Sequence, residues 1–383
     1  MKTLTIRFGL VVLVAFGTLG VLGCEGDDPE SSEGEGEGEG EGEGEGEGEG
    51  EGEGEGEGEC QPDPEDYLPP ALGVEDTWPV CIADDSADAW APINPSISSI
   101  ARVQAFAEMA AELWDNPALA AADFVDARFI YARDEGLDSR LQRREDEHYP
   151  KAVDAEGNPA TCQGEGIPAL NPDRCVGPAR LLPILNDAFV AGAGGTDLQD
   201  NAARVEAALI WFLYASVYKE AFTSTTTPKD ADSSYAYYTG GEGRDGGIGF
   251  AGYVRQEDSA THDAIWSGLL AVRCWRDLDQ AVPAADLVMR DRALGQLDAG
   301  LDRGLALVLV QRLDLLLGEG LGAAAQHAAW VFVQTLGPAI LRAAALADPP
   351  QAAVVEAELA RDAPTAENLQ TLQEALLGLF PCP

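Results

Sequence analysis

The sequence predicts an all-α fold, and three observations support that prediction. From Ser96 onward, apolar residues recur with the 3.6-residue period of a helix. Glycine and proline fall mostly between the periodic segments, where helices end and restart. Alternation of the strand type is scarce, with residues 250–254 as the best candidate. We therefore expect a multi-helix bundle of about eight or nine helices with two long irregular loops, stapled by disulfides.

Helices are expected wherever the apolar period persists. Residues 97–113 place seven apolar side chains on one face, after a cap at Ser96 or Ser98. A second helix over residues 119–137 follows an Asn-Pro pair and ends in a charged run. The two long loops are expected at residues 148–178 and 223–256. Further helices are expected at residues 180–190, 197–222, 257–279, 283–317, 321–346, 351–361 and 365–380.

Residues 321–341 contain no Asp, Glu, Lys or Arg, so two interpretations are considered. A transmembrane helix would explain the absence of charge, and so would a helix buried at the centre of the domain. The stretch is rich in alanine, contains Gln326, His327 and Gln334, and carries Gly337-Pro338. These features favour the buried helix.

Residues 1–23 have the features of a lipoprotein signal peptide. Lys2 and Arg7 introduce an apolar stretch of about 15 residues, which is shorter than a membrane span of roughly 20. The stretch closes on Val-Leu-Gly-Cys, which resembles a bacterial lipobox. That resemblance implies cleavage before Cys24 and acylation of Cys24, so that the membrane becomes a partner through the acyl chains. Because Glu25 follows in place of aspartate, we favour the outer membrane of the cell envelope.

Residues 24–59 are expected to be the lipidated cysteine and a disordered tether. Glutamate stands at every odd position from 33 to 59, with glycine between. Glycine has nothing to pack and the glutamates repel one another, so nothing offsets the entropic cost of ordering. The net charge of the chain is −43, of which residues 25–59 contribute −18 and residues 60–383 contribute −27. Such an acidic domain is not expected to bind nucleic acid.

The cysteine count agrees with export. Seven cysteines are present, and if Cys24 carries lipid an even number remains to pair in an oxidising compartment. Fifteen pairings are open, among which short loops favour Cys60–Cys81 and Cys162–Cys175 and leave Cys274–Cys382. A zinc site is the rival interpretation, but the chain has no CxxC pair and its three histidines are far apart. The disulfide candidates are Cys60, Cys81, Cys162, Cys175, Cys274 and Cys382.

The folded part is expected to have two regions. Residues 60–95 are rich in proline, aspartate and tryptophan without a clear period, which is typical of an irregular lead-in. Residues 96–383 form the helical domain.

Two short motifs invite a ligand interpretation. Gly241 to Gly246 matches G-x-G-x-x-G, but no strand is expected before it, so a turn is favoured over a dinucleotide site. Asp230, Asp232 and Ser234 alternate like the first ligands of an EF-hand loop. Position six of that loop would be Tyr235 instead of glycine, so helix capping and solvation compete with a calcium site. No other cofactor is expected.

One polar and aromatic pocket is expected at one end of the bundle. The helices over residues 197–222 and 257–279 both carry tyrosine, histidine or charged residues near the loop that joins them. These side chains would converge if the two helices pack antiparallel. The alternative is that Arg273, Arg276 and neighbouring aspartates form structural ion pairs. The residues of the expected pocket are Tyr218, Glu220, Tyr237, Tyr238, His262 and Arg273.

A large helical domain behind a lipobox is similar to imelysin-like bacterial lipoproteins. In that family a helix with a G-x-H-x-x-E pattern carries the suspected functional group. Here Ala260-Thr261 precedes His262, and Ile265 stands three residues after it. The resemblance therefore implies neither a ligand nor an activity.

The function expected from the sequence is that of a lipid-anchored cell-envelope protein acting as a binding or scaffolding module. Its partner would be an unidentified protein or small molecule. The alternative is an envelope enzyme or metal-uptake protein that uses the pocket near Tyr218, Tyr238, His262 and Arg273.

Overall fold

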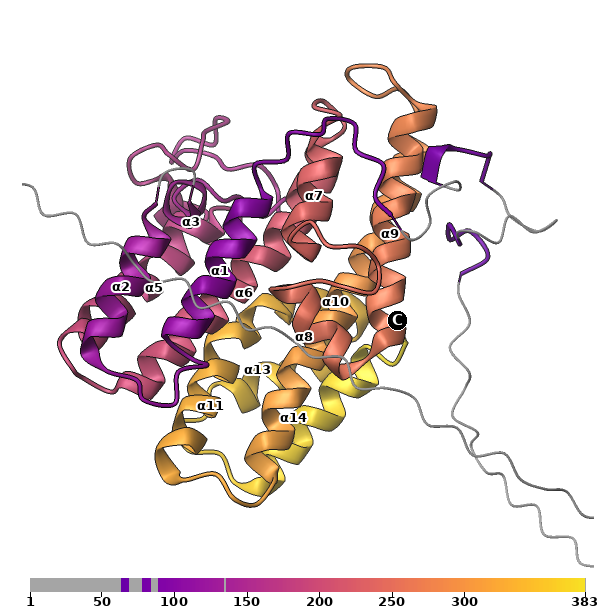
Figure 1. Cartoon of the computed structure of the whole chain (residues 1–383). Coiled ribbons are helices and arrows are strands. Elements are labelled where there is room, and N and C mark those ends of the chain that lie inside the picture. The colour runs from indigo at the N-terminus through magenta and orange to yellow at the C-terminus, as the bar shows by residue number, and fades with distance from the viewer. Residues whose placement is uncertain (1–62, 69–77, 84–88, 134–135, 383) are drawn as a thin grey trace, which may run out of the picture. The chain divides into compact units, whose positions relative to one another are not determined.

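Helices account for nearly all the regular structure, as Figure 1 shows. The computed structural model describes residues 63–68, 78–83, 89–133 and 136–382. These residues belong to one unit, Gly58–Pro383. The expected signal peptide, Cys24, the tether and Cys60 lie outside the described residues.

The all-α prediction is confirmed, because no strand occurs in the described ranges and only an isolated bridge joins Val153 and Pro159. The described helices outnumber the expected eight or nine, since short ones form where loops were expected. They are α1 (Ile100–Glu112), α2 (Ala121–Tyr131), α3 (Leu137–Leu141), α4 (Ile167–Leu170), α5 (Leu182–Ala193), α6 (Leu198–Thr223), α7 (Asp230–Thr239), α8 (Phe250–Glu257), α9 (Ser259–Leu278), α10 (Leu287–Leu317), α11 (Ala323–Leu336), α12 (Leu341–Ala347), α13 (Pro349–Leu359) and α14 (Ala366–Leu379).

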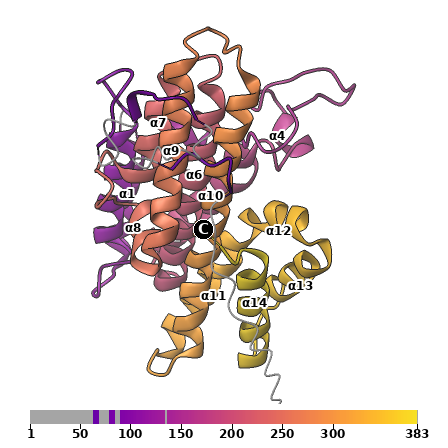
Figure 2. The same ribbon diagram turned by 90° about the vertical axis from the view of Figure 1, so that its right-hand side faces the viewer.

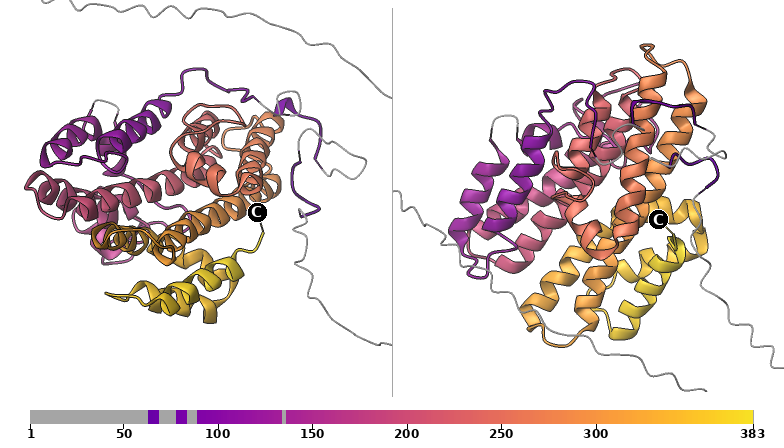
Figure 3. Two further views of the ribbon diagram at one scale, coloured as in Figure 1. Left: turned by 60° about the horizontal axis from the view of Figure 1, so that its bottom comes forward. Right: turned by 45° about the vertical axis from the view of Figure 1, so that its right-hand side comes forward.

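The long helices lie roughly in layers. In the left view of Figure 3, indigo α1 and α2 lie on one side and yellow α13 and α14 on the other, with α6, α10 and α11 between them. Each layer contacts the next, since α2 packs on α5, α5 on α6, α6 on α11, and α10 on α11 and α14. Figure 2 shows α12, α13 and α14 gathered as a group beside the other helices. The buried helix α6 therefore lies at the centre of the unit.

The closest helix pair, α9 and α10, depends on two glycines. A Cβ at Gly268 would lie 2.7 Å from the Cα of Leu297, and a Cβ at Gly300 would lie 2.9 Å from a side-chain carbon of Ile265. Real Cβ atoms essentially never approach a backbone carbon so closely, so the two backbones meet where a side chain is missing. Gly300 lies inside the continuous helix α10 and does not weaken it there.

The prediction of a second long irregular loop over residues 223–256 is wrong, because this segment contains α7 and α8. The best strand candidate, residues 250–254, also belongs to a helix, α8. Phe250, Ala251 and Val254 are buried and share one helical face. Tertiary burial of the tyrosines in α7 likewise overrides their modest helix propensity.

Two helix boundaries also differ from expectation. Helix α10 begins at Leu287, with the Asp286 carboxylate accepting the Met289 N–H, so Pro283 lies before the helix instead of in its first turn. The expected helix over residues 321–346 is broken at Gly337-Pro338, where proline cannot donate to the helical ladder. No single helix among the described residues is long and apolar enough to span a membrane; only the bent pair of residues 323–339 and 341–347, with an angle of 58°, passes by length and composition.

Two disulfides are described, and one of them corrects the expected pairing. Cys162 bonds to Cys175 across the loop of residues 148–178, as expected. Cys81 bonds to Cys274 on α9, so the pairings Cys60–Cys81 and Cys274–Cys382 are wrong. Cys382 is itself disulfide-bonded. The preference for short loops failed because the packing of the folded chain, and not loop length alone, decides which cysteines meet.

The lead-in is held against the helical domain by directional polar contacts. The Asp232 carboxylate of α7 accepts hydrogen bonds from the Trp90 indole and from the backbone N–H groups of Ile93 and Asn94. Trp90 also stacks on Tyr235, with 4.6 Å between the ring centroids. Asp232 is therefore a structural anchor for the segment that leads into α1.

Candidate functional site

The structure brings Tyr238 and His262 of the expected pocket together. The Tyr238 hydroxyl lies 2.9 Å from His262 Nδ1, and His262 Nε2 lies 2.7 Å from the carbonyl oxygen of Arg244. Nε2 therefore donates to the carbonyl and Nδ1 accepts from the tyrosine, which is the neutral form of the imidazole. Burial lowers the pKa of His262, in agreement with that form. Both ring nitrogens have partners in a buried position, as expected of a core histidine.

The other residues of the expected pocket contact different partners. Tyr218 stacks on His148, and the Glu220 carboxylate binds the buried guanidinium of Arg144. Tyr237 faces the same guanidinium, which lies 5.3 Å from its ring centroid. Arg273 donates to the carbonyl oxygen of Ala91 in the lead-in. None of these residues lines the large pocket described below.

The three oxygen groups proposed for calcium also have separate partners. Asp230 accepts from the Thr223 hydroxyl, Asp232 anchors the lead-in, and the Ser234 hydroxyl donates to the Val217 carbonyl. All three lie in the first half of helix α7 instead of in a loop. Within the described ranges, no group of three or more His, Cys, Asp and Glu residues is placed to hold a metal ion.

The glycine-rich motif of residues 241–246 connects α7 to α8. Gly240 and Gly241 adopt positive φ values of 72° and 93°, where glycine is the favoured residue. A helix precedes the motif, so the strand that a dinucleotide site needs before it is replaced by α7. The next glycines, Gly247 and Gly249, line a pocket on the side of α1.

A buried charge network surrounds His148. Its Nδ1 lies 2.6 Å from Asp146 and its Nε2 lies 2.8 Å from Asp298 of α10. Burial alone would lower the pKa of His148, but the hydrogen bonds to the two aspartates raise it to about 9. His148 is therefore a cation at neutral pH with a carboxylate at each nitrogen.

The network continues onto three other helices. Arg342 of α12 lies 3.3 Å from Asp298 and 3.6 Å from Asp302, both of α10. Burial and the neighbouring Asp298 raise the pKa of Asp302, which accepts a 2.6 Å hydrogen bond from the Tyr214 hydroxyl of α6. The loop after α3 is thereby joined to α6, α10 and α12.

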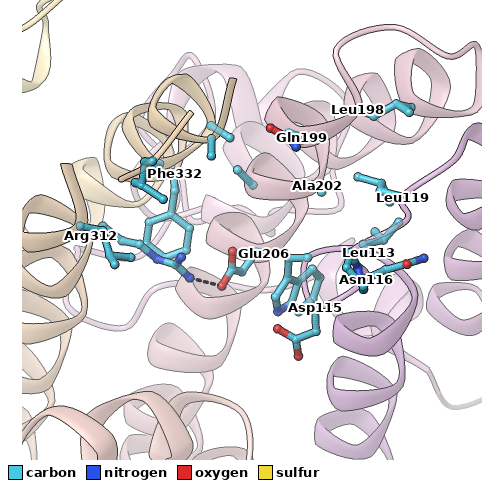
Figure 4. Close-up of a pocket in the computed structure, with 18 of the residues that line it drawn as sticks. Leu113, Asp115, Asn116, Leu119, Leu198, Gln199, Ala202, Glu206, Arg312 and Phe332 are labelled. Carbon is cyan, nitrogen blue, oxygen red and sulfur yellow. Dashed lines mark hydrogen bonds and ion pairs between the residues drawn. The ribbon is translucent and has the colours of Figure 1, made fainter. Parts of the chain in front are cut away.

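A large cavity, here called pocket A, has a volume of about 790 Å³. It lies where the corner between α1 and α2 faces α6, α10 and α11, as Figure 4 shows. Its walls are mostly apolar, and its charged lining residues are Asp115, Glu206 and Arg312. The apolar lining includes Leu113, Leu119, Leu198, Ala202, Ala203, Leu315, Ala325, Ala328, Ala329 and Phe332.

Glu206 and Arg312 form an ion pair in the wall of pocket A. Glu206 comes from the buried face of α6 and is 3% exposed. Its Oε1 accepts hydrogen bonds from Arg312 and from the Tyr253 hydroxyl. The guanidinium of Arg312 lies 4.3 Å from the ring centroid of Phe332, a cation–π geometry that fixes its position.

The electrostatics of Glu206 favour a further positive or donating group. Burial raises the pKa of Glu206, Arg312 and Tyr253 oppose that rise, and the negative charge of Asp115 adds to it. Figure 4 shows the two carboxylate oxygens of Glu206 pointing apart, with one of them directed at Arg312. The second oxygen, Oε2, makes no hydrogen bond within the described ranges.

A second cavity, pocket B, borders the same ion pair. It has a volume of about 440 Å³ and lies between α1, α8 and α10. Pockets A and B share Trp114, Asp115, Glu206, Arg312 and Leu315. The ion pair is therefore reached from two sides.

The sequence analysis missed this site because its residues are far apart in the chain. Glu206 and Arg312 are each a charge within an apolar helical stretch, and Arg312 is the only basic residue between Leu305 and Leu317. A charge of each sign at the edge of a long apolar stretch was the available signal. Only the packing of α6 beside α10 and α11 shows that the two charges meet.

Comparison with protein-family models, with curated proteins and with solved structures found no match to this chain.

Proposed function

We propose that this chain is a lipid-anchored protein of the cell envelope that binds a small, largely apolar ligand in pocket A. The observation that carries the proposal is an apolar cavity of about 790 Å³ with a buried ion pair in its wall. Small-molecule sites are typically concave and apolar, with a few fixed polar groups that orient the ligand. The position of Glu206 and Arg312 in pocket A fits that description.

The envelope location is supported by the lipobox-like residues and by the cysteines. Cys81–Cys274 and Cys162–Cys175 are bonded, and disulfides persist mainly in exported proteins. The charge of −27 on residues 60–383 supports a soluble domain held off the anionic membrane surface. Attachment through Cys24 would confine ligand binding to the vicinity of the membrane.

The geometry gives less support to an enzyme or a metal-uptake protein built on Tyr218, Tyr238, His262 and Arg273. His262 and Tyr238 satisfy each other in the core, and Arg273 is used by the lead-in. Binding in pocket A needs no rearrangement of these residues.

Filling pocket A is expected to abolish binding of an apolar ligand. Ala325 of α11 lines the pocket, whereas the neighbouring Ala324 is exposed and does not line it. The Ala325→Trp variant should lower the affinity for the uncharged probe N-phenyl-1-naphthylamine by about tenfold or more, because the indole would occupy the ligand volume. Fluorescence titration of the full chain measures this affinity.

Ala324→Trp is the matched control, since it adds the same side chain one residue away on the solvent side. The control should bind the probe like the unmodified chain. Equal affinity in the Ala325→Trp and Ala324→Trp variants, or an unmodified chain that does not bind the probe, would overturn the proposed function.

A further inference from the structure

The charges that line pocket A are unbalanced. Two carboxylates, those of the buried Glu206 and the exposed Asp115, and one guanidinium, that of Arg312, line it. Arg312 already donates to Glu206, so its positive charge is largely offset where it stands. The lining residues therefore leave a net charge of −1, and opposite charges attract more strongly in a partly desolvated cavity than in water.

The hydrogen-bond acceptors of the pocket likewise favour a ligand that carries hydrogen-bond donors. Glu206 Oε1 is saturated by Arg312 and Tyr253, while Oε2 makes no hydrogen bond to the described part of the chain. The Asp115 carboxylate makes no ion pair or hydrogen bond there either, since only its backbone N–H has a partner. Asp115 is exposed and Glu206 Oε2 is not a buried atom, so both carboxylates can accept hydrogen bonds from a ligand in the cavity. A hydrogen bond from a charged donor to a carboxylate is stronger than one between neutral groups.

An anionic head group fits the pocket less well. A carboxylate or phosphate would lie near Glu206 and Asp115 and would compete with Glu206 for Arg312. An uncharged hydroxyl would supply one donor but would not balance the charge. A primary ammonium supplies three donors and one positive charge, which matches both requirements.

The rest of the pocket selects an apolar body. Away from the ion pair, the lining includes the uncharged polar residues Asn116 and Gln199, and the rest is formed mostly by apolar side chains of α6, α11 and the α1–α2 corner. These side chains offer little to a polar ligand, so the binding free energy away from the head group comes from removing apolar surface from water.

We infer that pocket A binds an amphiphilic amine, with its ammonium group donating to Glu206 Oε2 near Asp115 and its apolar chain lying along α6 and α11. This inference rests on the proposed function, because it names the ligand class for the same pocket. The charged groups at the ion pair select the head group of the ligand, and the apolar walls of the pocket bind its chain.

The test compares three ligands with the same chain: n-decylamine, 1-decanol and decanoate. Each is titrated by calorimetry at pH 7.5 into the full chain, in about 0.15 M salt to screen exposed charges such as the Glu-Gly tract. Decylamine should bind about tenfold or more tightly than decanol, since a hydrogen bond to a charged group exceeds one to a neutral group. Decanoate should bind more weakly than decanol.

Two substitutions in pocket A and one control test which residues cause the preference for decylamine over decanol. Asp115→Asn is expected to reduce the preference for decylamine over decanol several-fold, because it removes one negative charge from the pocket. Asp126→Asn on α2 removes one exposed charge that does not line the pocket and should leave the preference unchanged. Glu206→Gln should abolish the preference. If that variant does not fold, the comparison of Asp115→Asn with Asp126→Asn still tests the inference.

The outcomes separate the inference from the proposed function. If all three ligands bind with similar affinity and displace the naphthylamine probe, the amine inference is overturned while the apolar pocket stands. Equal losses in Asp115→Asn and Asp126→Asn would show that only overall charge attracts the amine, which also overturns the inference. If none of the ligands binds, both fail.

Discussion

Replacing both Cys81 and Cys274 with alanine is expected to lower the free energy of unfolding by about 5 kcal/mol. The bond joins residues 193 positions apart, so its loss releases a long loop in the unfolded chain. Loop-closure entropy grows with the logarithm of loop length, which gives roughly 5 kcal/mol for a loop of this size. Denaturant titration of the full chain under non-reducing conditions measures the change.

Other contacts also hold the described residues before Trp90, since Tyr67, Trp78 and Ala83 are buried in the hydrophobic core. The backbone of Tyr67 exchanges two hydrogen bonds of 2.9 Å with the Gln296 amide, and the Ile82 N–H donates to Asp277. These bonds contribute about 1 kcal/mol each. These contacts remain when the cysteines are replaced, so the expected loss of stability is that of the loop-closure entropy.

The bond between Cys162 and Cys175 provides the matched control. Its cysteines are 13 positions apart, so their replacement by alanine should cost about 3 kcal/mol. A loss from the short loop that equals or exceeds the loss from the long one would contradict the entropic account.

The second large effect is a loss of stability between pH 6.5 and pH 9. His148 has a folded pKa of about 9, above its ordinary value of 6.5. A group with a raised pKa binds protons more tightly in the folded state, so its contribution is complete below pH 6.5 and is lost as the pH rises through 9. The shift corresponds to roughly 3 kcal/mol of unfolding free energy.

The charged neighbours of His148 come from several elements, and the two aspartates among them raise its pKa. Asp146 and Asp298 hold the two ring nitrogens, and Arg342 pairs with Asp298 on its other side. When the imidazole loses its proton, the buried Asp146 and the partly buried Asp298 lose a cation at hydrogen-bond distance. Urea titrations at intervals across this pH range measure the slope.

His148→Gln should reduce the stability at pH 6.5 and flatten the slope, since glutamine cannot carry the charge. His327 on α11 supplies the control, because its side chain is 60% exposed and His327→Gln should leave the slope intact. A slope that survives in the His148→Gln variant would assign the pH dependence to other groups.

The fold could be predicted from the sequence where burial follows a period. Helix α6 was expected at residues 197–222 and occurs at Leu198–Thr223, because its apolar residues face the core along its whole length. Helices α7 and α8 could not be predicted this way, since their tyrosine, serine and glycine residues favour turns locally. They are helical because Tyr237, Tyr238 and Phe250 are buried against α6, α9 and one another.

The candidate site could not be predicted from sequence patterns, for a related reason. Local patterns led to His262 and its tyrosines, which lie near one another in the chain and prove to be core residues. Glu206 and Arg312 are separated by 106 positions, and only helix packing brings them to one cavity. The Cys81–Cys274 bond escaped prediction in the same way, since contacts between distant residues are set by topology.

Pocket A is the proposed ligand site, and the position of a bound amine tests that proposal most directly. Trp114 lines pocket A, and its indole Nε1 has no hydrogen-bond partner in the described part of the chain. Trp114→Phe should therefore remove the fluorophore without losing a hydrogen bond. Trp211 of α6 does not line pocket A and serves as the control position.

The measurement is quenching of tryptophan fluorescence by decylamine carrying a bromine at the end of its chain. Quenching by bromine acts over short distances, so a ligand in pocket A should quench Trp114 before the other tryptophans. We expect saturable quenching in the unmodified chain and in Trp211→Phe, and loss of most of it in Trp114→Phe at amine concentrations that saturate this variant by calorimetry. Quenching that persists in full in Trp114→Phe would place the amine elsewhere and contradict the assignment of pocket A as the binding site.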